Sequence, residues 1–295
     1  MHDHLYNKFR KEPDVILGYS TNAYTQYTLL EAFAHIADLG FKGVEILCDQ
    51  PHLYPPEYDD AQLEKICQAL EHHKLKVTNL NSFTLFAVGD TYLPSWIEDD
   101  LGQRQIRIQH TRSSLRIAKK IGCGCISVPP GGPLNNIPRK KAMARFFKGL
   151  DQVVDLAEEL DVRLLVEPEP DLMIERTSQF QAFMQDVRSP AIGINFDIGH
   201  FFCAGEDPLA ALDTLFPWIG HVHLEDIGQS RIHQHLVPGD GAIDLKSVFK
   251  IMAELGYQGD ITLELYPYVN SPDVAGQKSL TYLRPILAES GYADF

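Results

Sequence analysis

The chain has 295 residues, of which 44% are hydrophobic and 22% charged, and 26 Lys and Arg against 40 Asp and Glu give a net charge of −14. This composition excludes a disordered chain, which has few apolar residues. It also disfavours nucleic acid as a partner, because phosphate backbones bind clustered Lys and Arg, and the one short basic cluster is 139–141. No run of about 20 apolar residues is present, so the sequence predicts no transmembrane helix and no membrane partner.

The cysteines and the start of the chain indicate a reducing compartment. The five cysteines have irregular spacing, which is not typical of a disulfide framework, and Cys123 and Cys125 are too close for an ordinary bridge. Residues 1–13 are polar and contain no apolar signal-peptide core. We therefore expect a polar N-terminal extension over 1–13, one domain over 14–295 and a cytoplasmic location.

Short apolar runs alternate with helical patterns almost from end to end of the chain. The apolar runs predict eight strands. The first has its apolar run at 15–17 and ends at 19–21, and the others cover 44–47, 75–80, 125–128, 162–166, 192–196, 219–224 and 261–265. Helical spacing predicts helices over 28–39, 59–73, 99–121, 139–160, 178–187, 208–215, 245–255 and 274–289. Thr28 and Glu31 fit a capping box at the start of the first helix, and a long loop over 81–95 follows the third strand.

This strict alternation favours one α/β domain, a single (β/α)8 TIM barrel. The strands are continuous Val, Ile and Leu runs, as expected of a parallel sheet covered on both faces. The alternative is an open doubly wound sheet, which usually has a glycine-rich turn after its first strand. Here that turn is Ser20-Thr21-Asn22-Ala23, so we favour the barrel.

Polar residues end several predicted strands, where a barrel of this type places its functional groups. Four consecutive strands present Glu167, Asp197, His223 and Glu264 at comparable positions. Because neighbouring strands lie about 4.8 Å apart, these side chains can meet at one point. Three carboxylates and an imidazole suit a divalent metal such as Mn²⁺, Mg²⁺, Co²⁺ or Zn²⁺. Without a cation the carboxylates would repel one another, and at least one would be protonated.

Each of these residues also has a purely structural interpretation. A single carboxylate at a strand end is often a helix N-cap or an ion-pair partner, and a single His is more often a hydrogen-bond partner than a ligand. His221 and His223 are two residues apart in a strand and point to the same face, so one or neither binds a metal. A metal site is favoured because residues that can bind a metal occur at comparable positions on four adjacent strands.

Five segments in order, 165–168, 195–200, 221–226, 238–244 and 263–265, resemble the successive motifs of the xylose isomerase-like barrel superfamily. That superfamily includes ketose 3-epimerases, sugar phosphate isomerases, inosose dehydratase, hydroxypyruvate isomerase and endonuclease IV. The resemblance implies that Glu167, Asp197, His223 and Glu264 bind the metal and that Glu167 and Glu264 are also the catalytic acid/base pair. It further implies that His200 contacts a substrate oxygen.

Other positions follow from the same resemblance. The stretch between His223 and Pro238 should supply another substrate contact, from Arg231, His233 or His235. We also expect Asn81 and Glu169 to face the substrate, with Glu169 standing where many relatives have a histidine. Endonuclease IV has metal-binding histidines at the places taken here by Asn81 and by 129–131, so a nuclease is disfavoured. His233 and His235 could hold a second ion, although a loop or substrate role is favoured.

The predicted function is a metal-dependent isomerase or epimerase of a ketose, sugar phosphate or polyol-derived ketone. Two carboxylates would move a proton beside a carbonyl through an enediolate, with a metal as electrophile. The alternatives are a dehydratase of an inosose or dehydroshikimate-like substrate and a non-catalytic metal-binding barrel.

The predicted partner is a small sugar-like molecule, and a homodimer is possible. Lys140 and Lys141 could hold a substrate phosphate, although a solvated helix start is the favoured interpretation. Phe83, Phe86 and Trp96 could cover a sugar's apolar face, or pack within the loop.

Overall fold

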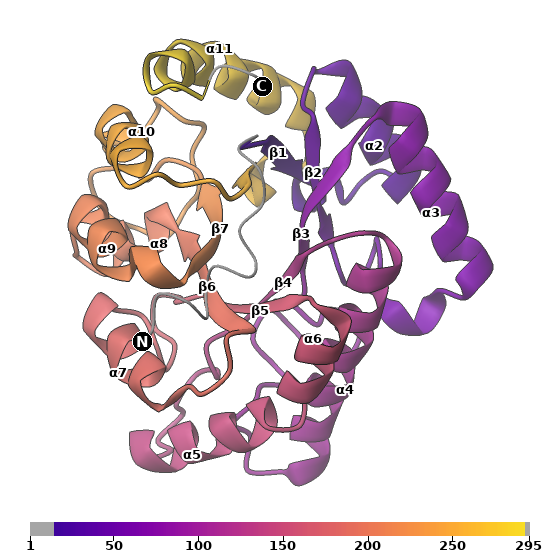
Figure 1. The fold of residues 1–295 in the computed structure, drawn as a ribbon, viewed down its shortest axis with the longest axis vertical. Helices are drawn as coiled ribbons and strands as arrows, with labels where there is room; N and C mark the ends of the chain where they lie inside the picture. The colour runs from indigo at the N-terminus through magenta and orange to yellow at the C-terminus, as the bar shows by residue number, and fades with distance from the viewer. Residues whose placement is uncertain (1–14, 293–295) are drawn as a thin grey trace.

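Eight parallel strands pair in chain order, and the last pairs with the first to close a barrel, as the sequence predicts (Figure 1). The computed structural model describes residues 15–292, so the predicted extension over 1–13 lies outside the described residues. The strands are β1 (Leu17–Ser20), β2 (Gly43–Leu47), β3 (Lys76–Asn81), β4 (Cys125–Val128), β5 (Arg163–Val166), β6 (Ile192–Asp197), β7 (Ile219–Leu224) and β8 (Ile261–Leu263).

Helices connect successive strands and surround the barrel (Figure 1). They are α2 (Leu29–Asp38), α3 (Asp60–His73), α4 (Leu101–Lys120), α5 (Arg139–Leu150), α6 (Val154–Leu160), α7 (Thr177–Asp186), α8 (Ile198–Cys203), α9 (Pro208–Leu215), α10 (Leu245–Glu254) and α11 (Pro272–Glu289). The predicted capping box is confirmed, since the Thr28 side chain accepts from the Glu31 N–H and the Glu31 carboxylate accepts from the Thr28 N–H.

Three sequence predictions about the elements need correction. The first strand begins at Leu17 rather than at residue 15, although it ends at Ser20, within the predicted range. The helix predicted over 139–160 is two helices, α5 and α6, separated by a turn. In that turn Val153 donates to the Leu150 carbonyl and is fully buried, so a tighter turn directs an apolar side chain into the core. The short helix α8, which the sequence analysis missed, begins directly after β6.

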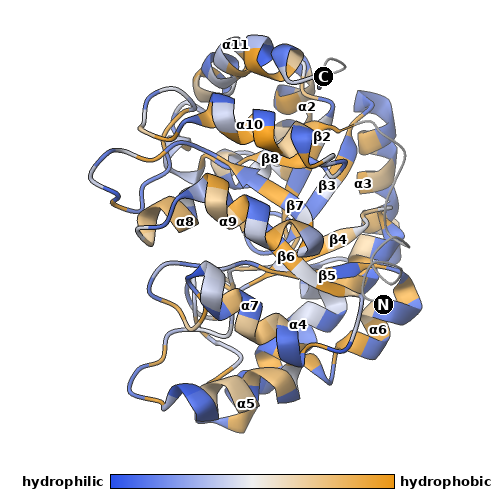
Figure 2. Ribbon diagram, turned by 60° about the vertical axis from the view of Figure 1, so that its left-hand side comes forward, coloured by the Kyte–Doolittle hydropathy of each residue, from blue (hydrophilic) through white to orange (hydrophobic). Residues whose placement is uncertain are grey.

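The apolar core lies between the barrel and its helices (Figure 2). Trp96 belongs to this core, because its ring packs edge-on against Phe146 with centroids 5.6 Å apart. A Cβ atom at Gly149 would lie 2.7 Å from the Trp96 ring, so the close contact between α5 and Trp96 requires glycine there. All five cysteines are free thiols. In the described residues no helix is both long and apolar enough to cross a bilayer.

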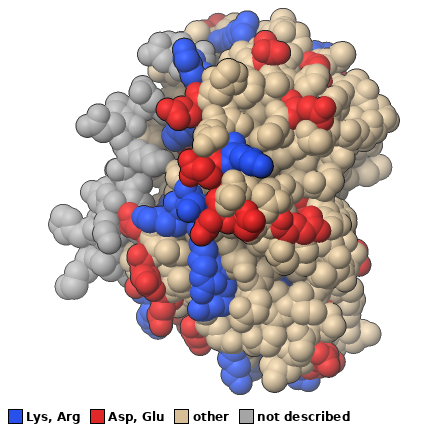
Figure 3. Space-filling model, turned by 90° about the vertical axis from the view of Figure 1, so that its right-hand side faces the viewer, with Lys and Arg blue, Asp and Glu red and all other residues tan. Residues whose placement is uncertain are grey.

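The outer surface carries charges of both signs. On the side of α2 and α3, Figure 3 shows acidic and basic side chains next to one another rather than in separate patches. Lys141 and Arg145, near the predicted basic cluster, both pair with Asp99. Neighbouring acidic groups therefore offset positive charge on this part of the surface.

Candidate active site

The barrel brings together the four residues that the sequence analysis proposed as metal ligands. Glu167 follows β5 directly, Asp197 ends β6, His223 lies in β7 and Glu264 follows β8. Asp197 and His223 are paired across neighbouring strands. One ligand atom from each of the four residues lies within 4.8 Å of the others, and all four side chains are buried. Residues up to 97 positions apart in the sequence thus form one cluster because the closed sheet aligns its strand ends.

The carboxylates of Asp197 and Glu167 each keep one oxygen free for another partner. Asp197 caps α8, and its Oδ1 accepts from the His200 backbone N–H at 2.8 Å. Its Oδ2 is buried without a hydrogen-bond partner, and so is Oε2 of Glu167. Unsatisfied buried carboxylate oxygens are rare, because the lost hydration costs free energy. The cluster therefore offers two buried oxygen atoms that could bind a cation.

Glu45 on β2 orients His223. Its Oε2 lies 2.6 Å from His223 Nε2, while Asn79 and Asn81 donate to the same carboxylate at 2.8 and 3.2 Å. His223 Nδ1 is therefore the nitrogen that faces the cluster, 3.0 Å from Glu167 Oε1 and 3.6 Å from Glu264 Oε2. Glu45 is a residue of the second predicted strand that the sequence analysis did not select. The available signal was a carboxylate within an otherwise apolar strand.

Glu264 is held in place from two sides. Its Oε1 accepts from Asn22 Nδ2 at 2.9 Å and from Asn81 Nδ2 at 3.2 Å, so its Oε2 turns toward His223. Its backbone carbonyl accepts from His235 Nδ1 at 2.9 Å. Asn22, in the loop after β1, is a second residue that the sequence analysis did not select.

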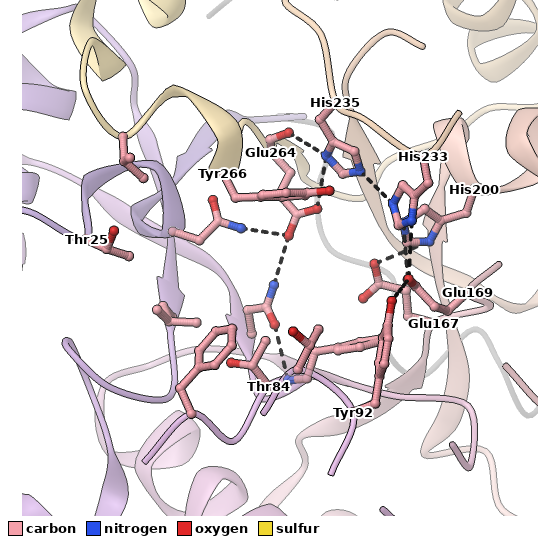
Figure 4. Close-up of a pocket in the computed structure, with 17 residues that line it drawn as sticks. Thr25, Thr84, Tyr92, Glu167, Glu169, His200, His233, His235, Glu264 and Tyr266 are labelled. Carbon is pink, nitrogen blue, oxygen red and sulfur yellow. Dashed lines mark hydrogen bonds and ion pairs between the residues drawn. The ribbon is translucent and has the colours of Figure 1, made fainter. Parts of the chain in front are cut away.

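A cavity of about 480 Å³ opens above this cluster (Figure 4). Glu167 and Glu264 enter it from opposite sides. Its walls are formed by Asn22, Thr25, Leu47, Asn81, Phe83, Thr84, Phe86, Thr91, Tyr92, Glu167, Glu169, His200, His233, His235, Glu264, Tyr266 and Val269. The volume is within the range of about 300–1,000 Å³ that is typical of small-molecule sites.

The structure brings most of the predicted substrate-binding residues to this cavity, but not all. Asn81, Glu169, His200, His233 and His235 line its wall. Arg231 does not, because its guanidinium lies over the Phe202 ring at 4.2 Å and donates to the Phe202 carbonyl. Phe83 and Phe86 reach the cavity, whereas Trp96 is in the core. Lys140 and Lys141 are also outside its walls.

Three histidines and Glu169 meet at one side of the cavity. The ring nitrogens of His200, His233 and His235 lie within 4.8 Å of one another, with the two Nε2 atoms of His233 and His235 at 3.2 Å. His200 Nδ1 donates to the Pro168 carbonyl at 2.8 Å, which turns its Nε2 toward Glu169 Oε2 at 3.3 Å. These side chains are placed to contact a ligand's oxygen or nitrogen atoms.

The segment over 238–244, one of the five predicted motifs, has a structural role beside this site. The buried carboxylate of Asp226 accepts from the backbone N–H groups of Gly239, Gly241 and Ile243. Asp226 also pairs through its backbone with Leu236, so both ends of the loop that bears His233 and His235 are tied to β7. A side chain at Gly241 would lie 2.2 Å from Asp226 Oδ1, which explains the glycine.

Comparison with known proteins decides the family. A family model described as a xylose isomerase-like TIM barrel matches residues 33–286. The chain belongs to the xylose isomerase-like TIM barrel family. The predicted resemblance is therefore confirmed.

Three proteins illustrate what the chain is similar to. Fructoselysine 3-epimerase from Escherichia coli O157:H7 is 23% identical over 279 residues, which cover 92% of this chain and 98% of that relative. A D-tagatose 3-epimerase-like protein matches with a TM-score of 0.78 at 20% identity, over 93% of this chain and 99% of that one. The IOLI protein with a zinc atom matches with a TM-score of 0.77 at 17% identity, over 94% of this chain and 99% of that one. Inosose dehydratases and a family 2 AP endonuclease are also similar.

In this family member the buried cluster is electrostatically strained. Burial, and next the charge of Glu167, raise the pKa of Asp197 from 3.8 to about 7. Burial raises the pKa of Glu264 well above its usual range, although His223 opposes the shift. Burial alone would lower the pKa of His223, but the carboxylates of Glu45, Glu264 and Glu167 raise it well above its usual range. A divalent cation would replace the protons that now reduce this repulsion.

In the metal-free protein the contribution of Asp197 to stability should therefore fall as the pH rises from about 4.5 to 7. The folded state keeps a proton on Asp197 that the unfolded chain has released above its pKa of 3.8, so this group's contribution to the free energy of unfolding falls with pH. Buried His200, His221 and His235 contribute in the opposite direction below about pH 6.5, because burial lowers their pKa values. The Asp197 contribution is therefore expected as a difference in slope, on the order of 1 kcal/mol per pH unit, between wild type and a variant without this carboxyl group. Glu45 acts oppositely, since burial raises its pKa but His223 lowers it to about 2, and this effect is confined to pH below the ordinary glutamate pKa of 4.5.

Urea unfolding of chelator-treated protein at about pH 5, 6 and 7 measures this slope. Relative to wild type, Asp197→Asn, which has no proton to release, should lose the part of the slope by which stability falls with pH, and the exposed Asp171→Asn should keep the wild-type slope. The same pH dependence in wild type and Asp197→Asn would contradict the prediction.

Proposed function

We propose that the protein is a divalent-metal-dependent epimerase or isomerase of a ketose, acting through an enediolate. The observation that carries this proposal is the cluster of Glu167, Asp197, His223 and Glu264 at the base of the cavity, with Glu167 and Glu264 on opposite sides of it. Such a pair can remove a proton from one face of a carbon atom and return one to the other. The full-length similarity to a fructoselysine 3-epimerase supports the same class of reaction.

The donor set fits a divalent cation. The free buried oxygens of Glu167 and Asp197 lie beside His223 Nδ1 and Glu264 Oε2. Three hard oxygen donors and one nitrogen suit Mn²⁺, Mg²⁺ or Co²⁺, and also Zn²⁺. Glu45 would keep His223 in the correct orientation, because a carboxylate on the far nitrogen fixes the tautomer and ring position of a metal-binding histidine. When bound, the ion supplies positive charge that stabilises the enediolate.

The carboxylates of this chain would move the protons. One of Glu167 and Glu264 removes the proton from the carbon next to the substrate carbonyl, and the electron pair of that C–H bond forms the enediolate. The other carboxylate returns a proton to the opposite face of the same carbon, which gives the epimer, or to the neighbouring carbon, which gives the isomer. The substrate's overall oxidation state does not change, so no external oxidant or reductant is needed.

Neighbouring side chains would position the substrate and the acid/base pair. Asn22 and Asn81 hold Oε1 of Glu264, so its Oε2 is the oxygen free to exchange a proton. His200 presents Nε2 to the cavity because its Nδ1 is committed to the Pro168 carbonyl. Burial, and next His233 and His235, lower the pKa of His200 well below its usual range, so its neutral ring can bind a substrate hydroxyl group.

Exchange of solvent deuterium into ketoses tests the proposal. Mn²⁺-loaded protein is incubated in D₂O with a panel of free ketoses, and the carbon next to the carbonyl is followed by NMR. We expect deuterium at that carbon together with an epimeric or isomeric product, and no exchange after chelation. A conjugated enone detected by its ultraviolet absorbance would instead indicate a dehydratase. Binding without exchange would indicate a non-catalytic barrel and would overturn the proposal.

A further inference from the structure

Among the described residues, acidic side chains line the cavity and Lys or Arg side chains do not. Three carboxylates, those of Glu167, Glu169 and Glu264, line it, whereas within 15–292 no Lys or Arg does. Arg231, on the neighbouring loop, points away toward the Phe202 and Glu206 carbonyls. Two further buried carboxylates lie beside residues of the four-residue cluster, Glu45 next to His223 and Glu225 next to Asp197. A divalent ion at the proposed metal site would offset only part of this negative charge.

Glu169 is the carboxylate that the proposed metal site leaves unused. Its side chain is 5% exposed, and it does not belong to the four-residue cluster. Oε1 accepts from the Tyr92 hydroxyl at 2.9 Å, and both oxygens lie near histidine nitrogens, His233 at 3.5 Å and His200 at 3.3 Å. Glu167 lines the same cavity, so a positive group beside Glu169 would be attracted by both carboxylates.

Aromatic rings surround the path from Glu169 to the mouth of the cavity. Tyr92, Phe86 and Tyr266 line the wall, and the last two are 52% and 41% exposed, as expected of residues at the opening. Figure 4 shows Tyr92 reaching Glu169 from one side of the cavity and Tyr266 crossing above Glu264. Aromatic faces beside a carboxylate, with no Lys or Arg side chain in the described wall, are the arrangement that recognises ammonium groups.

We propose that this cavity selects a non-phosphorylated ketose that carries a protonated amine, and that Glu169 is the residue that determines this specificity. The inference rests on the proposed function for the ketose part of the substrate. The amine would lie against Glu169 and the rings of Tyr92 and Tyr266, while the ketose end would face Glu167 and Glu264. A phosphate group would meet carboxylates where it needs Lys, Arg or backbone N–H donors, so phosphorylated sugars would bind weakly.

Three ligands that differ only in the substituent at C1 test the charge preference. These are 1-amino-1-deoxy-D-fructose, D-fructose and D-fructose 1-phosphate, and their binding to Mn²⁺-loaded wild-type protein is measured by calorimetry. We expect the amine to bind about tenfold more tightly than fructose, and the phosphate about tenfold more weakly or not at all. Equal affinities, tighter binding of the phosphate, or binding of none of the three would overturn the inference.

A matched pair of variants identifies the residue responsible. Glu169→Gln should reduce the preference for the amine over fructose to about twofold or less, because the amide keeps the shape but not the charge. Asp171→Asn removes a carboxylate that is exposed and outside the cavity walls, and it should keep the wild-type preference. A preference that persists in Glu169→Gln would assign the selection to other groups and overturn the role of Glu169.

This experiment fails separately from the test of the proposed function. Exchange of deuterium into neutral ketoses without any preference for the amine would leave the proposed function standing and remove only the charge selection. Tight binding of the amine without deuterium exchange at any carbon would support the charge selection and overturn the proposed function.

Discussion

Glu264→Gln is expected to lower kcat by about 10²–10⁴-fold, the usual contribution of a general acid or base. Glutamine has the same size and can still accept from Asn22 and Asn81 through its carbonyl oxygen. Its amide nitrogen would then lie where Oε2 now faces His223. A side-chain amide is neither a general acid nor a general base near neutral pH. The variant should therefore keep its fold and lose both turnover and deuterium exchange.

The measurement is kcat and deuterium exchange at saturating Mn²⁺, because the amide nitrogen also weakens the affinity for the ion. Glu254→Gln, on the exposed side of α10, is the control and should behave as wild type. Thermal melting of both variants shows whether the fold is retained. Turnover at the wild-type rate in folded, metal-saturated Glu264→Gln would exclude Glu264 from the acid/base pair.

His223→Ala is expected to abolish metal binding. It removes the single nitrogen from the proposed ligand set and leaves Glu45 buried without its closest partner. Because breaking a buried ion pair can cost about 3–5 kcal/mol, this variant can also be too unstable to isolate. Glu45→Gln is therefore made as well. It retains all four ligands but loses the carboxylate that orients His223, so we expect the metal affinity to fall about 10–100-fold.

Metal content by mass spectrometry, after chelation and reloading with Mn²⁺, measures both effects. His233→Ala is the control, since His233 lies in the cavity wall outside the four-residue cluster, and it should keep the full metal content. Full occupancy in His223→Ala would refute the proposed ligand set. A second ion in wild type that is lost in His233→Ala would place an additional metal at the three histidines.

The fold was predictable because each part of its evidence is local. A parallel strand covered on both faces must be apolar along its length, and helices must repeat every 3.6 residues, so both patterns are visible in one sequence. The errors fall where local signals are weak. The turn between α5 and α6 contains no Gly or Pro, and it exists because Val153 packs into the core.

The sequence by itself determined the barrel, the family resemblance and the four polar strand ends that meet at its mouth. Only the tertiary structure decided the contacts across the barrel. Glu45 lies 178 positions before His223, and Asn22 lies 242 positions before Glu264, so neither pair has any local pattern. The same holds for Arg231, which loop geometry directs away from the cavity, and for Glu169, whose contact with Tyr92 depends on how the loop after β3 folds back. The positions of the proposed metal ligands follow from the ends of the strands. The orientation of His223 and Glu264 and the proposed substrate specificity depend instead on long-range packing.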